Sequence, residues 1–176
     1  MSTSLVLTVI ADDRPGIVET LATAVLAAGA NWEESRMARL SGKFAGLLRV
    51  SVEEAGAEAL ASRLAALSGP EMTVVVGRTS TAGAQAFQSL HLELVGNDRP
   101  GIVRDVARVL AAQHVNIEEL ETDVVSAPMS GELLFRAKAE LRVPSNLAVD
   151  ALRRQLESLA GELMVDVDLV EGAREA

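Results

Sequence analysis

The residues best suited to binding or catalysis lie in two copies of one six-residue motif, Asp-Arg-Pro-Gly-Ile-Val, at residues 13–18 and 98–103. Each copy follows an apolar stretch and precedes a segment whose apolar residues recur about every four positions. This order predicts a strand, a tight loop and a helix. The first backbone N–H groups of a helix have no partner within it and favour an anion. A small carboxylate could therefore bind at each copy.

Polar side chains near these loops suggest which other groups the ligand carries besides a carboxylate. Asp12 and Asp13 could face an ammonium group, and Asn31, past the far end of the first helix, offers both a donor and an acceptor. Asn31 could contribute only if a neighbouring subunit brings it near. A carboxylate acceptor beside an acidic group suits an α-amino acid. The predicted ligand-binding residues are Asp12, Asp13, Gly16, Ile17, Val18 and Asn31 in the first copy, and Asn97, Asp98, Gly101, Ile102, Val103 and Asn116 in the second.

A structural role explains each of these residues as well. Asp before a helix is a common cap, Pro15 and Pro100 suit the first helical turn, and Asn between a helix and a strand is a frequent turn residue. A duplicated domain copies its structural residues as faithfully as its functional ones, so repetition leaves both interpretations open.

Residues for catalysis or metal binding do not form a convincing set. His91 and His114 are the only histidines, and the chain has no cysteine to supply a thiolate or a disulfide. Glu119, Glu121 and Asp123 share one face of a predicted strand and could hold a divalent cation, as could Asp166 and Asp168; a solvated face is the simpler interpretation. We therefore expect no catalytic residue, no metal and no cofactor, and a protein that is not an enzyme.

The repeat extends well beyond the six-residue motif. At a shift of 85 residues, 11 of the 23 positions from Asp12 to Glu34 are identical, which indicates a tandem duplication of a small domain. A stretch of small and polar residues suits a flexible connection between the copies. The predicted organisation is a first domain at 1–78, a linker at 79–89, a second domain at 90–171 and a tail at 172–176.

Both copies show the same order of elements. Strands are predicted at 5–11, 32–40, 44–52 and 72–76 in the first copy, and at 90–94, 117–125, 133–143 and 163–169 in the second. A loop through 127–131 joins the second copy's middle strands, and Gly29 and His114 end corresponding helices. The fold class is α+β: two tandem ferredoxin-like βαββαβ domains. Right-handed crossovers place both helices on one face of each antiparallel four-stranded sheet.

The other face of the first sheet has an apolar character. Leu5, Leu7 and Val9 point to one side of the first strand, which leaves Val6 and Ile10 on the other. Burying a side chain such as Ile10 contributes roughly 1.5–3 kcal/mol. One hypothesis is that the other domain or another subunit covers this face; the alternative is that two such residues on a half-exposed strand have no significance.

The composition disfavours several classes of binding partner. With 16 basic and 25 acidic residues, the net charge of −9 disfavours binding to nucleic acid or anionic membranes. Only four aromatic residues occur, too few for base-stacking platforms (Trp32, Phe44, Phe87 and Phe135). No apolar run approaches the ~20 residues of a membrane span. We expect a cytoplasmic protein.

The repeated motif, followed by a helix and then Asn-Trp or Asn-Ile, resembles the ACT domain. Two such domains over residues 4–170 are similar to the family of the glycine cleavage system transcriptional repressor. The resemblance implies a ferredoxin-like fold, assembly through sheet edges or faces, and an amino acid held between ACT domains by the loop and Asn positions given above. It also implies a co-repressor that touches an activator protein and not DNA.

These observations favour a non-catalytic amino-acid sensor, with glycine and serine as candidate ligands, that modulates transcription through a partner protein and forms a homo-oligomer. The alternatives are a constitutive oligomerisation or adaptor module, and a regulatory subunit of an amino-acid biosynthetic enzyme. Trp32 stands where the second copy has Ile117, and Asp12 where it has Asn97, so the two sites could differ in ligand or occupancy.

Overall fold

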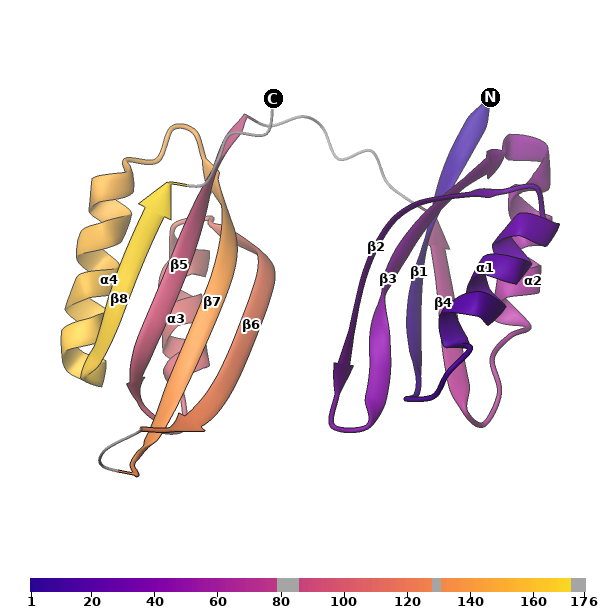
Figure 1. Ribbon diagram of the computed structural model, residues 1–176. Coiled ribbons are helices and arrows are strands. Elements are labelled where there is room, and N and C mark those ends of the chain that lie inside the picture. Colours follow the sequence, from indigo (N-terminus) through magenta and orange to yellow (C-terminus); the bar gives the residue numbers. More distant parts are fainter. Residues whose placement is uncertain (79–85, 128–130, 172–176) are drawn as a thin grey trace. The chain divides into compact units, whose positions relative to one another are not determined.

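The computed structural model describes residues 1–78, 86–127 and 131–171 (Figure 1). The chain divides into two compact units, Met1–Ala82 and Gly83–Ala176. Each unit contains one antiparallel sheet of four strands with its helices on one face (Figure 1). The predicted α+β fold, a pair of tandem βαββαβ domains, is confirmed.

The first domain has the strand order β2-β3-β1-β4. Its elements are β1 (Ser2–Asp12), α1 (Ile17–Ala27), β2 (Asn31–Leu40), β3 (Lys43–Glu53), a 3₁₀ turn (Glu54–Gly56), α2 (Ala57–Ala65) and β4 (Met72–Arg78). Alternation along β1 sends Leu5, Leu7 and Val9 to the helix side, where each is at most 1% exposed. They pack with Leu21 of α1 and Leu60 of α2 in one apolar core.

The second domain repeats this arrangement in the order β6-β7-β5-β8. Its elements are β5 (Phe87–Asn97), α3 (Ile102–Ala112), β6 (Asn116–Ser126), β7 (Leu133–Pro144), α4 (Val149–Leu163) and β8 (Val165–Glu171). Leu90 and Leu92 of β5 pack with Leu152 and Leu156 of α4. Leu94 belongs to a second cluster nearer the start of α3.

Glycines start the first helix of each domain. Gly16 and Gly101 are the N-cap residues, with φ of 93° and 100°, a left-handed conformation that costs glycine little. The prolines therefore lie before the N-cap, and the prediction that they occupy the first helical turn is wrong. The chain must first make a left-handed turn that proline, with its fixed φ, cannot make. At the other helix ends, Gly29 (φ 66°) and His114 (φ 56°) confirm the predicted correspondence.

Two boundaries differ from expectation. α4 continues to Leu163, so the predicted strand start at 163 is wrong: Leu163 is 4% exposed within the helical core, and Met164 ends the helix at φ 54°. β5 begins at Phe87, within the predicted linker range. The rest of that linker up to residue 85, the tail 172–176 and loop residues 128–130 lie outside the described residues. In the part of the chain that the structure describes, no helix has the length and apolar character to span a bilayer.

Candidate functional site

The start of α1 presents backbone donors to solvent. The carbonyl of Gly16 accepts hydrogen bonds from the backbone N–H and the hydroxyl of Thr20, both at 2.9 Å. No side chain caps this helix. Among the described residues, none accepts a hydrogen bond from the N–H of Ile17 or Val18. The predicted donors are therefore available to an anion.

A hollow lies beside these donors. It has a volume of about 330 Å³ and is lined by residues 13–19 and by Phe44 of β3. Volumes of this order suit small ligands. Ile17 is buried at 6% exposure and anchors the helix, whereas Val18 is 48% exposed at the rim. The loop thus has a buried base and an open side.

The carboxylates of the first loop already have cationic partners. Lys43 donates to Asp12, and Arg39 Nε donates to Asp13. Both cations come from the β2–β3 hairpin, whose turn also contacts the loop through a hydrogen bond from the Asp13 N–H to the Gly42 carbonyl at 3.0 Å. A ligand ammonium group at either carboxylate would have to compete with these ion pairs.

The second domain lacks both cations. Asn97 stands in place of Asp12, and its strand partner is Leu134 where the first domain has Lys43. Arg39 pairs with Phe44 in the first domain, and Val124 pairs with Phe135 at the same register position in the second. A valine therefore stands where the first domain has the guanidinium of Arg39. No described residue forms a side-chain hydrogen bond or ion pair with Asp98. The second loop therefore offers an exposed carboxylate that the first does not.

The second loop also carries charges that the repeat search missed. Asp105 accepts hydrogen bonds from Arg104 Nε at 3.0 Å and Nη2 at 2.9 Å. A carbon added to Gly101 would lie 3.5 Å from that Nη2 atom, so the guanidinium lies beside the helix start. The first copy has Glu19 and Thr20 at these positions. A search for residues that the two copies share cannot find such differences. The change of charge between two otherwise matching loops is the sequence signal that indicates them.

The two predicted asparagines lie away from their loops. Asn31 opens β2 opposite Ser51, which in turn pairs with Ser4 of β1. Ser4 and Asp12 are eight residues apart on one strand, which separates Asn31 from the loop by about 26 Å. Asn116 opens β6 in the same way. Within one domain the structure does not bring the asparagine and the loop together; a site using both needs a second domain or copy.

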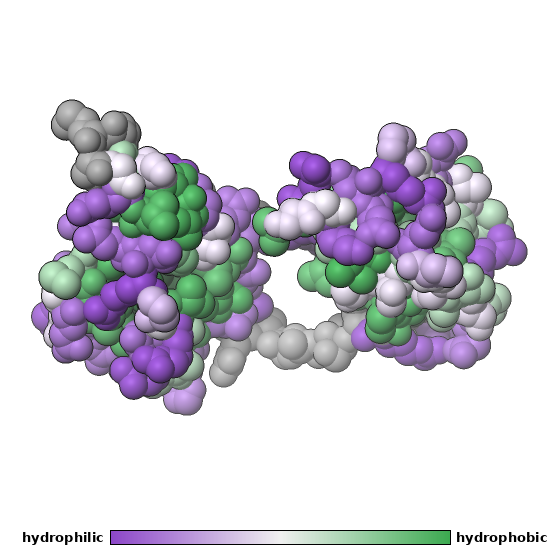
Figure 2. Space-filling model, turned by 90° about the horizontal axis from the view of Figure 1, so that it is seen from below, coloured by the Kyte–Doolittle hydropathy of each residue, from purple (hydrophilic) through white to green (hydrophobic). Residues whose placement is uncertain are grey.

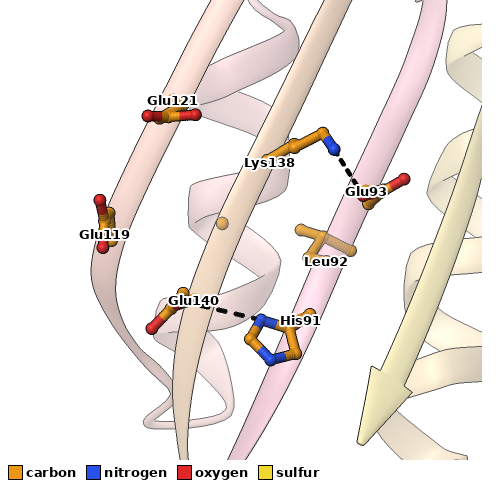
Figure 3. A pocket seen from close by; sticks show the side chains of 8 residues that line it. His91, Leu92, Glu93, Glu119, Glu121, Lys138 and Glu140 are labelled. Atoms are coloured by element: carbon orange, nitrogen blue, oxygen red, sulfur yellow. Dashed lines mark ion pairs between the residues drawn. The ribbon is translucent and has the colours of Figure 1, made fainter. Parts of the chain in front are cut away.

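The open face of the second sheet is charged. A hollow of about 250 Å³ lies there, in which Lys138 pairs with Glu93 at 2.9 Å and His91 lies 3.9 Å from Glu140. Figure 3 shows both pairs between side chains of β5 and β7. Glu119 and Glu121 line the same hollow from β6. The described residues contain no group of three or more His, Asp or Glu side chains arranged to hold a metal ion. The side chains that line this hollow are mostly charged.

One ion pair on this face shifts the pKa of both of its members. Arg136 donates hydrogen bonds to Asp123, through Nε at 2.9 Å and through Nη2. The hydrogen bond and the positive charge of Arg136 lower the pKa of Asp123 below 3.8. The same contact raises the pKa of Arg136.

The open face of the first sheet is apolar by comparison. Ile10, Leu47 and Val75 lie on three adjacent strands and are 47%, 51% and 60% exposed. Apolar residues reach the surface of each domain between polar ones (Figure 2). The predicted apolar character of this face is present over several strands, not on β1 alone.

Comparisons with known proteins identify both halves. Family models described as ACT domain match residues 3–76 and 85–165. A crystal structure of an unknown protein from Galdieria sulphuraria is 34% identical, with a TM-score of 0.83, over 98% of this chain and all of that one. A structure named for a candidate glycine cleavage system transcriptional repressor is 22% identical, with a TM-score of 0.71, over 99% of both chains. No curated protein sequence matches.

Proposed function

Because the chain belongs to the ACT domain family, with one such domain in each half, we propose that it is a cytoplasmic amino-acid sensor without catalytic activity. In this proposal a small amino acid binds at the loops before α1 and α3, and its presence changes a contact with a partner protein. The observation that carries the proposal is the pair of helix starts at Gly16 and Gly101, where no side chain caps the amides.

The chemistry of these loops supports a zwitterion. Uncapped N–H groups at a helix start attract a carboxylate through the helix dipole and direct hydrogen bonds. At the second loop the exposed carboxylate of Asp98 is suited to an ammonium group. Arg104, which is paired with Asp105, lies beside the helix start and adds positive charge there. Asn31 and Asn116 would join the proposed sites across an interface with another copy of the chain.

A role in transcription is the finer part of the proposal. It is supported by the shared full-length fold with the candidate glycine cleavage system repressor. The net charge of −9 favours contact with an activator protein over contact with DNA. The proposed ligands are glycine and serine. An adaptor module or a regulatory subunit of a biosynthetic enzyme would share the fold but differ in ligand response or partner.

We also propose that the chain forms a homo-oligomer through the open face of the first sheet. The exposed apolar residues there lie on adjacent strands on either side of Thr8, so association would remove them from water together. The charges around it are largely paired within the domain: Lys43 with Asp12, and Arg49 with Glu33 at 3.2 Å. Two copies could therefore meet there without strong repulsion.

Thermal unfolding of the full chain with a panel of free amino acids tests the proposal. A ligand present at 100 times its dissociation constant should add about 2.7 kcal/mol to the free energy of unfolding. Glycine or serine should raise the midpoint, and N-acetylglycine, which lacks the ammonium group, should raise it less. Absence of a shift with every amino acid would contradict the sensor and leave the adaptor.

A further inference from the structure

β4 forms one edge of the first sheet, with β1 on its inner side (Figure 1). In an antiparallel pair, the backbone groups of successive residues point alternately toward the partner strand and away from it. The Glu71 carbonyl points toward β1, because it accepts a hydrogen bond from the Asp12 N–H at 3.0 Å. Met72, Val74 and Val76 therefore turn their N–H and C=O groups away from β1, toward the free edge.

The sequence of β4 suits pairing with another strand. Met72–Gly77 carries no charge and includes three consecutive valines, which have a high β-propensity. An edge strand of this kind, with free N–H and C=O groups, is a template for strand addition by another chain. An uncovered β4 would therefore invite pairing with a second copy of the chain.

The loop between α2 and β4 covers this edge. Ser68 Oγ accepts a hydrogen bond from the Val74 N–H at 2.9 Å and donates one to the Val74 carbonyl at 3.2 Å. The Gly69 N–H donates to the Met72 carbonyl at 2.8 Å. In the part of the chain that the structure describes, no group bonds to the outward N–H or C=O of Val76. The loop thus occupies two of the three outward positions that a new strand would need.

The loop is also held from its other side. The Ser68 N–H donates to the Ala65 carbonyl at 3.0 Å, and Leu67 packs against the core of the first domain. Pro70 restricts the backbone of the loop further, because its ring fixes φ. Ser68 is therefore fastened to the end of α2 and to β4 at the same time.

The second domain protects the matching edge differently. A single residue separates α4 from β8, so no loop is available there to cover β8. By strand register, Asp166 and Asp168 of β8 stand where β4 has Thr73 and Val75. Charged side chains on an edge strand oppose pairing with another chain. The uncharged strand has the loop, and the strand without a loop has the charges.

We propose that the loop 66–71 is a strap that blocks strand addition at β4, and that Ser68 fastens it. When the strap opens, β4 pairs with β4 of a second copy in an antiparallel arrangement centred on Val74, with Met72 opposite Val76. The strap thus prevents edge-to-edge pairing and leaves the open face of the first sheet as the surface for association. This inference concerns assembly alone and does not depend on an amino-acid ligand.

Amide hydrogen exchange of the full chain tests the strap residue by residue. Ser68→Ala removes both hydroxyl contacts and should make the Val74 amide exchange about fivefold faster or more. Ser62→Ala is the matched control, because it makes the same change at an exposed position of α2 and should leave Val74 as it is in the native chain. Ser68→Thr keeps the hydroxyl and should restore the native rate.

Pairing is measured at Val76, whose amide points to the free edge. Ser68→Ala combined with Gly69→Pro also removes the backbone bond of the loop, and its Val76 amide should become more protected as the protein concentration rises. Association through the open face leaves this amide unprotected, so the two kinds of association are distinguishable. Adding Thr73→Asp, which copies Asp166 into β4, should abolish the protection.

Two results would overturn the strap. One is a Val74 amide that exchanges at the native rate in Ser68→Ala. The other is a double variant whose Val76 amide is equally unprotected at every concentration. If the double variant does not fold, Ser68→Ala alone supplies the second test, because its Val76 amide should still gain protection with concentration while that of the native chain does not.

Discussion

The guanidinium of Arg39 on β2 forms an ion pair with the carboxylate of Asp13 in the loop before α1. The pair joins residues 26 positions apart and links the β2–β3 hairpin to the proposed ligand loop. It neutralises a carboxylate that a ligand ammonium group would otherwise meet. In the second domain the corresponding position is Val124, which has no charge to pair with Asp98. The duplicated loops therefore differ in electrostatics although their six-residue motifs are identical.

The first prediction concerns this pair. Arg39→Gln removes the cation and should increase affinity for a zwitterion at the first loop, because Asp13 then offers an unpaired carboxylate. The cost in stability should be small, about 0.2–1 kcal/mol, since the pair is exposed to solvent. Calorimetric titration with glycine in the native chain and the variant measures the affinity. Arg63→Gln, on α2 away from the loop, is the control, and equal affinities in all three proteins would contradict the prediction.

The second prediction removes one ligand donor at a time. Val18→Pro and Val103→Pro each delete an N–H that no described residue accepts, at a helix position where proline is tolerated. Each should lower the ligand-induced rise in melting temperature, with the larger loss from whichever domain binds the ligand more tightly. Thermal unfolding with and without glycine and serine measures this.

Val18→Ala and Val103→Ala serve as controls, because they shorten the same side chains and retain the N–H. An alanine variant that loses the response as fully as its proline counterpart would assign the effect to the side chain. Replacing Gly16 or Gly101 by valine is a weaker test, since φ near 100° is strained for any residue with a Cβ.

Much of this architecture could be predicted from the sequence, because the evidence for it is local. Alternation in β1 and the repeated loop motif indicate the strands and helix starts directly. The partners of Asp12 and Asp13 could not be found that way. Lys43 and Arg39 reach them only through the register of a hairpin more than twenty residues away. The predicted strand start at Leu163 is wrong for a different reason: a short apolar run fits either a strand or the last turn of a helix.

The sequence repeat also fails to show which core positions of the two domains are equivalent after the second hairpin's loop. Leu48 and Ala139 are 91 positions apart, not 85, because the second hairpin is longer. Only strand register shows that they are equivalent. Alignment through the sheet also shows differences that the identities do not, such as Val124 at the position of Arg39.

The third prediction concerns pH. Because Arg136 lowers the pKa of Asp123, the carboxylate stabilises the folded state above the ordinary pKa of 3.8, and this contribution is lost as pH falls through the lower folded value. Arg136→Gln should raise the midpoint of Asp123 towards 3.8. Carbon-13 NMR of the side-chain carboxyl follows it residue by residue. Arg153→Gln, on α4, is a control that should leave the midpoint in place.

The last prediction concerns association. Ile10→Lys and Val75→Lys each place a charge on the open apolar face of the first sheet, where both side chains are about half exposed, so the fold should tolerate them. Burying a lysine against a second copy is costly unless a partner charge is present. Sedimentation velocity should therefore show a smaller species for either variant than for the native chain at equal concentration. Val170→Lys places the same charge on the acidic open face of the second sheet and should leave the oligomer intact. A native chain that sediments as a monomer, or variants that keep the native size, would exclude this face as the interface.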